Sequence, residues 1–379
     1  MSDLDPQLID LAIGQPAPDL LPVHFFERVT QAFTQRLDPE LLNYGDYAGD
    51  PRFLEALARF LTAHYGFAVH PGSLFLCAGA SHGIDLACRL CCERGDVVLV
   101  EEPTYFLALE IFASLGLQVV SVAMDDEGLV PEALQQALAQ HPRAKVLYTI
   151  PVHHNPTSIT LSGERREQIL ALTRARGVTV LADEVYQLLH FGQSPPLPAP
   201  FAAHVQGGGV VSVGSFSKIL APAMRVGWLQ TDPDTRAQLC QQGVIRSGGA
   251  INQVGSLFVR GAIESGLLDE HLRERLVPVL RTRAATMAQG LARWAEALGV
   301  RWRPAQGGYF FWLELPARVD TAALLARARP AGVGFHPGVR FSASDEQRRT
   351  LRLSFARFNE PQIEVAMERL GQVIESQAH

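Results

Sequence analysis

The chain has 379 residues, of which 47% are hydrophobic and 19% charged, so it can bury a core that needs neither disulfides nor structural metals. The formal net charge is −6 and no block of like charges occurs, which argues against a nucleic acid or a membrane surface as the partner. The N-terminus is polar and acidic and no apolar run reaches the roughly 18 residues of a membrane span, so we expect a cytoplasmic protein.

Between about residues 50 and 230, short apolar runs alternate with amphipathic stretches of helical period. The apolar runs end at Gly, Pro or charged residues, as is typical of buried parallel strands. This alternation predicts a parallel sheet with helices on both faces and a ligand crevice at the carboxyl edge of its strands. The predicted strands are residues 73–77, 97–100, 119–122, 146–150, 178–182 and 210–213, and the predicted helices are residues 52–64, 131–139 and 163–176.

The pattern changes after about residue 250, where a long helical stretch covers residues 267–298. Strands are then predicted at residues 308–313 and 350–355, and helices at residues 321–328 and 361–374. This mixture indicates a second, α+β domain. We expect a large domain of residues 30–290 and a small domain made of residues 1–29 and 291–379.

The chain contains two lysines, Lys145 and Lys218, and all its other basic side chains apart from histidine are arginines. A guanidinium cannot form an imine with an aldehyde, so a lysine nucleophile has to be one of these two. Lys218 follows Ser215 and Ser217 at the end of a predicted strand, and Arg225 comes seven residues later. This group favours a site for an anionic, aldehyde-bearing cofactor. Taken alone, the pattern also fits a surface lysine after a serine-rich turn.

Two more predicted strands end in residues that suit the same edge of the sheet. Asp183 follows residues 178–182 and could pair with a protonated ring nitrogen, which keeps the ring an electron sink. Tyr186 could place its phenol on an oxygen of that ring. The alternative for Asp183 is an N-cap that opens a helix. Asn155, in the rigid turn after residues 146–150, would project at the same edge.

A turn of small residues at positions 77–83 joins a predicted strand to a helix. Backbone N–H groups at such a helix start favour a phosphate. The turn lacks the Lys-Ser/Thr of a Walker loop and is not G-x-G-x-x-G, so the phosphate need not belong to a nucleotide.

Two groups of residues could suggest a metal. Cys88, Cys91 and Cys92 share one predicted helix, but no second ligand pair lies at matching spacing, so buried structural thiols are the better interpretation. His153 and His154 have no carboxylate or thiol at ligand spacing, which favours a loop or pocket-wall role. We predict no metal site.

Several short segments, taken in their order along the chain, resemble those of fold-type-I pyridoxal 5′-phosphate (PLP) enzymes of the aspartate aminotransferase superfamily. The resemblance is closest to the class I/II group with the 2-aminoadipate and aromatic aminotransferases and the aminotransferase domain of MocR regulators. It implies a three-layer αβα large domain with a smaller α+β domain. The segments that carry it are LNYGDYAGDPRFLEA (42–56), GASHG (79–83), EPTY (102–105), NPT (155–157), DEVY (183–186), SFSK (215–218), RVGW (225–228), GGYF (307–310) and LRLSF (351–355).

The chain departs from the family pattern at two positions and lacks one segment. Ser158 stands where Gly is usual, and His82 stands where Gln or another polar residue is common. No winged-helix segment precedes residue 1, so we do not expect a MocR-type transcription factor.

The resemblance implies a role for each candidate site residue. Lys218 would hold PLP as a Schiff base and transfer the substrate's α-proton, Asp183 would pair with the pyridine nitrogen, and Tyr105 would stack on the ring. Arg352 would bind the substrate carboxylate through its planar fork, together with Asn155 and the N–H of Gly14. The other cofactor contacts would be Ala80, Ser81, His82, Asn155, Tyr186, Ser215, Ser217, Arg225 and, from a second subunit, Tyr44.

The predicted reaction is ping-pong transamination between an L-amino acid and a 2-oxo acid, in a homodimer with shared sites. A PLP-dependent β-lyase would use the same residues, since a fold does not fix a reaction, and a catalytically silent regulatory domain is a second alternative.

Substrate choice is predicted to depend on residues 14–23 and on loops near Tyr47 and Phe335. The apolar residues Leu20, Leu21 and Val23 favour a neutral or aromatic substrate side chain. Arg28 leaves a dicarboxylate possible.

Overall fold

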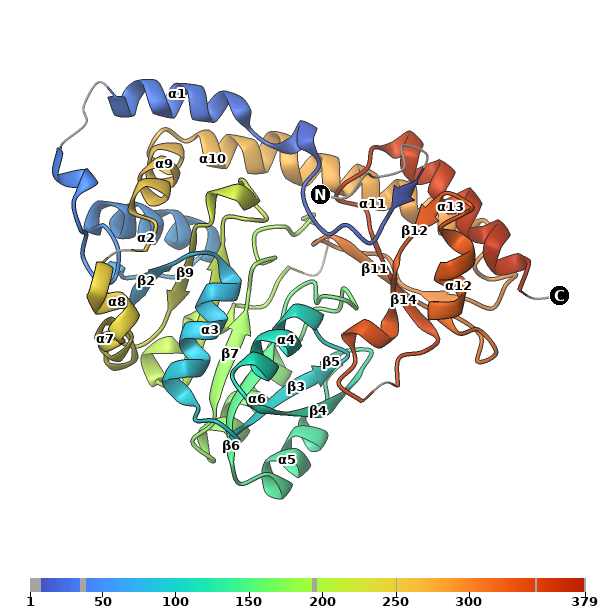
Figure 1. The fold of residues 1–379 in the computed structure, drawn as a ribbon, viewed down its shortest axis with the longest axis horizontal. Helices are drawn as coiled ribbons and strands as arrows, with labels where there is room; N and C mark the ends of the chain where they lie inside the picture. The colour runs from blue at the N-terminus through green and yellow to red at the C-terminus, as the bar shows by residue number, and fades with distance from the viewer. Residues whose placement is uncertain (1–7, 35–38, 193–195, 250, 345, 378–379) are drawn as a thin grey trace.

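The computed structural model describes residues 8–34, 39–192, 196–249, 251–344 and 346–377. Its centre is an eight-stranded sheet with helices packed against both faces (Figure 1), which is the three-layer arrangement predicted from the sequence. The strand order is β2 (Leu74–Cys77), β9 (Gly227–Gln230), β8 (Val210–Ser215), β7 (Thr179–Asp183), β6 (Ala144–Thr149), β3 (Val97–Glu102), β4 (Gln118–Asp125) and β5 (Gly128–Leu129).

Both faces of the central strands are buried, which explains why their sequences are apolar throughout. In β3, Val98 and Val100 pack into the core that contains α3, whereas Val97 and Leu99 pack into a second core with α5 and α6. The helices around this sheet are α2 (Pro51–Tyr65), α3 (Ala80–Cys91), α4 (Phe106–Ser114), α5 (Pro131–Gln140), α6 (Gly163–Arg174), α7 (Pro233–Gln241), α8 (Gly243–Gly248) and α9 (Gln253–Glu264).

The sheet is not entirely parallel, and in this the sequence prediction is wrong. Strand β9 was not predicted; it returns from β8 through the turn that contains Lys218 and lies antiparallel between β2 and β8. Strands β4 and β5 form an antiparallel hairpin, and β4 is partly exposed. Because β2 and β8 both oppose β9, they run parallel to each other. Their carboxyl ends therefore lie at the same edge as those of β3, β6 and β7.

The C-terminal residues form a second sheet, in the order β10 (Arg301–Trp302), β11 (Phe310–Glu314), β14 (Thr350–Ser354) and β13 (His336–Pro337). Helices α12 (Thr321–Ala328) and α13 (Glu360–Glu375) pack together beside it. Near the N-terminus, β1 (Ile9–Asp10) pairs in parallel with β12 (Val333–Gly334). This pairing supports a small domain that includes the N-terminal segment, but the predicted boundaries remain a prediction, and residues 1–7 lie outside the described ranges.

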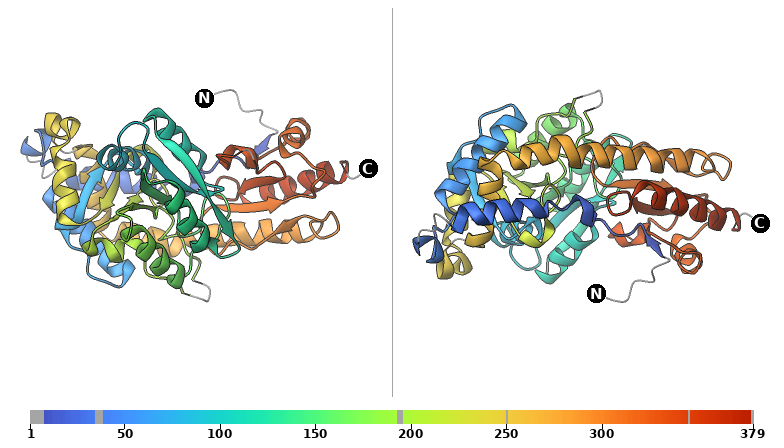
Figure 2. Two further views of the ribbon diagram at one scale, coloured as in Figure 1. Left: turned by 90° about the horizontal axis from the view of Figure 1, so that it is seen from below. Right: turned by 90° about the horizontal axis from the view of Figure 1, so that it is seen from above.

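A long helical element connects the two parts of the molecule. It consists of α10 (Leu267–Glu270), a π-helical segment (His271–Leu276) and α11 (Val277–Ala292), and it ends six residues before the predicted residue 298. The view from above in Figure 2 shows it running beside both parts. Helix α1 (Val23–Thr34) packs on α9.

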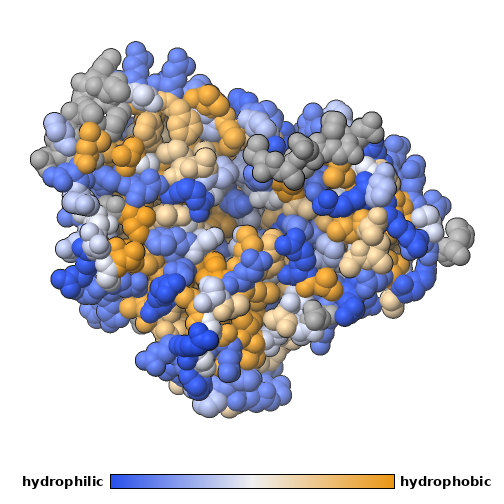
Figure 3. All heavy atoms as spheres, in the orientation of Figure 1, coloured by the Kyte–Doolittle hydropathy of each residue, from blue (hydrophilic) through white to orange (hydrophobic). Residues whose placement is uncertain are grey.

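Polar residues are spread over the face drawn in Figure 3, with smaller apolar groups between them. Among the described residues, no helix is long and apolar enough to cross a membrane.

Candidate active site

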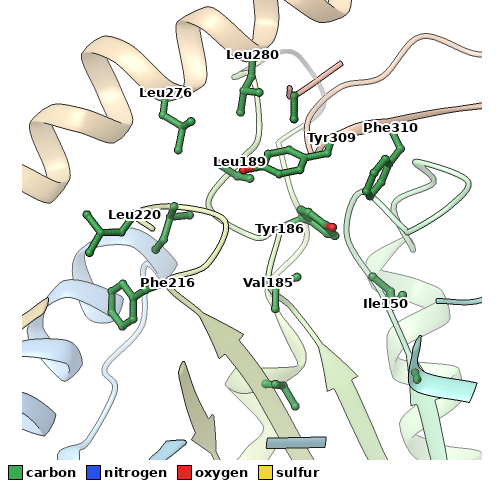
Figure 4. Close-up of a cluster of buried hydrophobic side chains, with 14 of the residues drawn as sticks. Ile150, Val185, Tyr186, Leu189, Phe216, Leu220, Leu276, Leu280, Tyr309 and Phe310 are labelled. Carbon is green, nitrogen blue, oxygen red and sulfur yellow. The ribbon is translucent and has the colours of Figure 1, made fainter. Parts of the chain in front are cut away.

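The carboxyl ends of β2, β3, β6, β7 and β8 meet at one edge of the large sheet, where a cavity of about 510 Å³ opens. Figure 4 shows strands pointing toward a group of buried side chains here, among them Val185, Tyr186 and Tyr309. Most of the predicted site residues line this cavity. They are Gly14, Ala80, Ser81, Tyr105, Asn155, Asp183, Tyr186, Ser215, Ser217, Lys218, Arg225 and Arg352.

Two predicted site residues do not line the cavity. The ring of His82 turns back, and its Nδ1 accepts a hydrogen bond from the backbone N–H of Ala78 at 3.1 Å. Tyr44 lies away from the cavity, and 83% of its surface is exposed. Because its expected contact is with a cofactor in a second subunit, the role of Tyr44 stays a prediction.

Lys218 lies in the turn after β8, and contacts on both sides fix its position. The N–H of Leu220 donates to the carbonyl of Phe216 at 2.8 Å and closes the turn. Lys218 Nζ donates to the Gly14 carbonyl at 2.9 Å and lies 5.3 Å from the centre of the Tyr309 ring. The Tyr309 hydroxyl donates to the Lys218 carbonyl at 2.8 Å. The amine therefore faces the cavity, and the surface-lysine alternative does not hold.

The electrostatics of the cavity favour a neutral Lys218 amine. Burial lowers the pKa of Lys218 to about 8, with Arg352 acting in the same direction and Asp183 opposing it. More of this amine is neutral at physiological pH than of an ordinary lysine, so it can act as a nucleophile or a base. Lys145, the other lysine, is exposed on β6.

Asp183 presents one free carboxylate oxygen to the cavity. It is buried at the end of β7 and is followed by a turn rather than a helix, so it is not an N-cap. Its Oδ2 accepts from the Tyr148 hydroxyl at 2.8 Å, whereas Oδ1 is buried without a hydrogen-bond partner among the described residues. Burial raises the pKa of Asp183 to about 6, and the bond from Tyr148 opposes this shift. Such an oxygen is costly to bury unless a cation or donor faces it.

Tyr148, on β6, lies outside the motifs identified from the sequence. The available signal was a tyrosine within a buried strand, because a buried phenol needs a hydrogen-bond partner.

Glu184, next to Asp183, has a structural role. Its carboxylate accepts from the N–H groups of Phe201 at 2.7 Å and Ala202 at 3.1 Å, and from the Ser212 hydroxyl at 2.7 Å. Adjacent acids thus serve the cavity and the structural core separately.

The loop that carries Asn155 is supported by a buried carboxylate that the sequence analysis missed. Glu101 accepts from the Thr149 hydroxyl and the Ile150 N–H, each at 2.8 Å, and its Oε2 lies 3.1 Å from His154 Nε2. No carboxylate lies at ligand spacing from the histidines in the sequence, but β3 brings Glu101 beside the loop in space. Within the described ranges, no three potential ligands form a metal-binding group.

The other unusual residues have structural explanations. Ser158 has a φ of 62°, in the left-handed region that glycine adopts most easily, and its hydroxyl bonds the Phe310 carbonyl. Cys88 is buried as expected, but Cys91 and Cys92 lie at the end of α3 and are only partly buried.

The other end of the cavity is rich in hydrogen-bond donors. Arg225 extends along the start of α3: its Nη2 donates to the Ala78 carbonyl at 3.0 Å and its Nη1 to Ser217 Oγ at 3.4 Å. The Ser217 N–H donates to Ser215 Oγ at 3.1 Å, which fixes both hydroxyl-bearing residues in one turn. A guanidinium, hydroxyls and a helix N-terminus at Ala80 together suit a phosphate.

Arg352, on β14, is held rigidly in a buried position. Its Nη1 donates to Asn155 Oδ1 and its Nη2 to the Ala12 carbonyl, both at 2.8 Å. Its guanidinium carbon lies 4.0 Å from the centre of the Phe310 ring and 4.9 Å from that of Phe341. Burial lowers its pKa to about 10, so it stays charged at physiological pH. In the described part of the chain, all these partners are uncharged, which leaves the cation available to a carboxylate.

The segments expected to select the substrate line the cavity only in part. Leu20 is buried elsewhere, and Leu21, Val23 and Arg28 also lie outside its wall. Tyr47 and Phe335 are absent from the lining, but His336, next to Phe335, belongs to it. The N-terminal segment contributes Asp10, Ala12, Ile13 and, from the expected segment, Gly14 and Gln15, and the C-terminal part contributes Phe310, Arg329, His336 and Arg352.

The sequence model of the family described as Aminotransferase class I and II matches residues 6–370. The chain belongs to this family. Aromatic-amino-acid aminotransferase 1 of Thermococcus litoralis is 30% identical over 376 residues, which cover 98% of this chain and 88% of the relative. The 2-aminoadipate transaminase of Thermus thermophilus is 31% identical over 373 residues, which cover 97% of this chain and 90% of the relative. Kynurenine aminotransferase of Pyrococcus horikoshii, solved with PMP, KYN and KYA, matches with a TM-score of 0.90 at 29% identity, over 98% of this chain and 92% of that chain.

The protein is thus a PLP-dependent aminotransferase of class I/II. The residues in the cavity fit the cofactor. The free oxygen of Asp183 would face the pyridine nitrogen, Lys218 offers an amine of lowered pKa, and Arg225 with its neighbouring hydroxyls would hold the phosphate.

Gly79 provides a specific test of the phosphate end of this aminotransferase. It has a φ of +83°, and a Cβ there would lie 2.7 Å from Arg225 Nη2. We expect Gly79→Ala to displace the guanidinium and to raise the dissociation constant for PLP by about tenfold or more, measured by titrating the apoenzyme. Gly66→Ala is the matched control, because Gly66 also has a positive φ of +75° but nothing lies within 4 Å of its Cβ position. Equal losses in both variants would mean that only backbone strain matters.

Proposed function

We propose that this aminotransferase exchanges an amino group between an L-amino acid and a 2-oxo acid, with Lys218, Asp183 and Arg352 as the central residues of its site. One observation carries this assignment: an amine of lowered pKa, a buried free carboxylate oxygen and an uncompensated guanidinium face the same cavity. These are the groups needed to transfer a proton, to hold a protonated ring nitrogen and to bind an α-carboxylate.

PLP, when bound, supplies an electron sink that stabilises negative charge at the substrate's α-carbon. Lys218 would take the proton from that carbon, hold it at Nζ and release it again as the acid of the second proton transfer. The lowered pKa of Lys218, about 8, supports this role, because a general base works best when its pKa lies near the working pH. The contact between Lys218 Nζ and the Gly14 carbonyl orients the amine within the cavity.

Arg352 would orient the substrate. Its fork is fixed by Asn155 and Ala12 and sandwiched between two phenylalanine rings, so little entropy is lost when a carboxylate binds. A carboxylate at Arg352 would hold the α-carbon at a constant position near Lys218. Tyr105 and Tyr186 would complete the wall around the ring, consistent with their place in the cavity lining.

We also propose a homodimer in the cytoplasm. The exposure of Tyr44, together with that of Leu42, Tyr47, Val244 and Val254, is consistent with an apolar contact surface on the large-sheet part of the chain. Under this proposal, Tyr44 of the partner subunit reaches the phosphate of the cofactor. Sedimentation of the purified protein and fractionation of cells test these two statements.

The function is tested by a half-reaction. Purified holoenzyme is mixed with an excess of one L-amino acid, without a 2-oxo acid, and the visible spectrum is followed. We expect a loss of the visible band, release of the matching 2-oxo acid in an amount equal to the active sites, and recovery of the band when a second 2-oxo acid is added. Continuous release of ammonia without an acceptor would instead establish a β-lyase. A spectrum that no amino acid changes would support the silent regulatory domain.

A further inference from the structure

One side of the cavity is formed by residues from the C-terminal part of the chain. Arg329, at the end of α12, and His336, on β13, line the cavity, and Arg340 belongs to the short 3-10 helix Gly338–Phe341 that follows. Arg340 contacts the lining at two points. Its Nη1 lies 3.2 Å from His336 Nδ1, and its guanidinium carbon lies 4.4 Å from the centre of the Phe106 ring. We call Arg329, His336 and Arg340 the cationic rim.

The two arginines of the cationic rim differ in their partners. Arg329 Nη2 lies 3.2 Å from Asp10 Oδ2, so this charge is neutralised within the cavity wall. Arg340 has no carboxylate partner among the described residues, and its contacts are an imidazole and an aromatic ring. Its side chain is also exposed to solvent. The rim therefore carries one uncompensated positive charge that an anionic group can reach.

His336 does not add to this charge, but it adds a donor. Burial and the nearby cations Arg352, Arg340 and Arg329 lower the pKa of His336 to about 3, so the ring is neutral at physiological pH. Because Nδ1 faces the Arg340 donor, the proton of the neutral ring belongs on Nε2. The rim thus combines a cation with an N–H donor, which suits a carboxylate.

The cations around the cavity lie on different structural elements. His336 of β13 lies opposite Arg352 of β14 in the second sheet, whereas Arg225 bonds Ser217 and the Ala78 carbonyl at the start of α3. Arg352 and Arg340 therefore both lie beside His336, while Arg225 belongs to the phosphate end. Once a phosphate is assigned to Arg225 and an α-carboxylate to Arg352, Arg340 is left without an anion.

We propose that the cationic rim, with Arg340 as its charged centre, binds the distal carboxylate of dicarboxylic substrates. The inference rests on the proposed function and assigns its substrate class: dicarboxylic L-amino acids and the corresponding 2-oxo acids. Arg340 then acts as a specificity-determining residue. The apolar residues Phe106 and Leu107 beside it form the wall along which the substrate's methylene groups lie.

The test compares substrates of equal length that differ in the distal carboxylate. The kcat/KM values for L-glutamate and L-norvaline are measured for the wild-type holoenzyme and for Arg340→Gln, with L-aspartate and L-2-aminoadipate added to find the preferred chain length. We expect the ratio of kcat/KM for the best dicarboxylic substrate to that for norvaline to fall at least about tenfold in Arg340→Gln, mainly through KM. Arg340→Lys, which keeps the charge but not the fork, should recover part of the ratio.

Arg327→Gln is the matched control. Arg327 is exposed on α12 and does not line the cavity, and its substitution removes the same charge as Arg340→Gln. An unchanged ratio in Arg340→Gln, an equal fall in Arg327→Gln, or a selective loss of activity toward L-phenylalanine would overturn the proposal. These outcomes differ from a failure of the proposed function, in which the wild-type holoenzyme would transaminate none of the amino acids.

Discussion

Replacing Lys218 with alanine is expected to lower kcat/KM for transamination by about 10⁴-fold or more. The variant loses the amine that faces the cavity and would transfer the proton, and general acid–base catalysis alone contributes up to about 10⁴-fold. We expect the phosphate contacts to remain, since Arg225, Ser217 and Ser215 bond to one another and not to the lysine side chain. PLP should therefore still bind, which equilibrium dialysis would establish. Steady-state kinetics with one amino acid and one 2-oxo acid measure the loss of rate.

The second lysine provides the control for this variant. Lys145 is exposed on β6, outside the cavity lining, so Lys145→Ala should keep the wild-type rate. A small primary amine such as ethylamine, added to Lys218→Ala, should restore part of the activity because it can replace the missing base. If Lys218→Ala kept a tenth of the wild-type kcat/KM, the amine would not be the base and the site assignment would be wrong.

Asp183→Asn is expected to lower kcat by about 10²- to 10³-fold with a smaller effect on KM. The substitution keeps the shape and the partner Tyr148 but replaces a carboxylate, which can hold a protonated ring nitrogen, with a neutral amide. Arg352 and Lys218 are unchanged, so substrate binding is largely preserved. Glu184→Gln is the informative comparison: the folded protein should keep its kcat because Glu184 faces the backbone of residues 201–202. Equal losses of kcat in the two variants would contradict the role of Asp183.

The same variant should differ from wild type in the pH dependence of apoenzyme stability. The folded pKa of Asp183, about 6, lies above the ordinary value of 3.8, because burial disfavours the charged form. Its contribution therefore lowers the stability of the folded apoenzyme as pH rises from about 4 to 6, and this cost remains at neutral pH. Apo Asp183→Asn should then be at least as stable as apo wild type at pH 7 in thermal unfolding. Added PLP should stabilise the wild type more than the variant.

Much of the site could be predicted because its residues follow strands in short, recognisable segments. Lys218, Asp183 and Asn155 lie at or shortly after the carboxyl ends of apolar runs that mark buried strands. Parallel strands bring their carboxyl ends to one edge of the sheet. Antiparallel β9 escaped prediction because four residues after a turn carry too weak a periodicity. The sheet edge was nevertheless predicted correctly, because β9 does not change the direction of its neighbours.

The missed residues share a physical cause: their role depends on partners distant in sequence. Tyr148 acts on Asp183 only because β6 and β7 are neighbours, and Glu101 reaches His154 because β3 lies beside β6. The cationic rim depends on the second sheet and on the N-terminal segment, whose register against the cavity no local pattern specifies. The expected specificity segments line the cavity only in part for the same reason: Gly14 and Gln15 line it, whereas the apolar residues Leu20, Leu21 and Val23 do not.

The measurement that tests the central claim most directly is reductive trapping of the cofactor. The holoenzyme is treated with sodium borohydride, digested and mapped by mass spectrometry to find which lysine carries the phosphopyridoxyl group. The site described here predicts the label on the peptide that contains Lys218, in an amount that matches the loss of activity, with no label on Lys145. A label on Lys145, or a protein that binds PLP without any trapped lysine, would contradict the assignment of the active site.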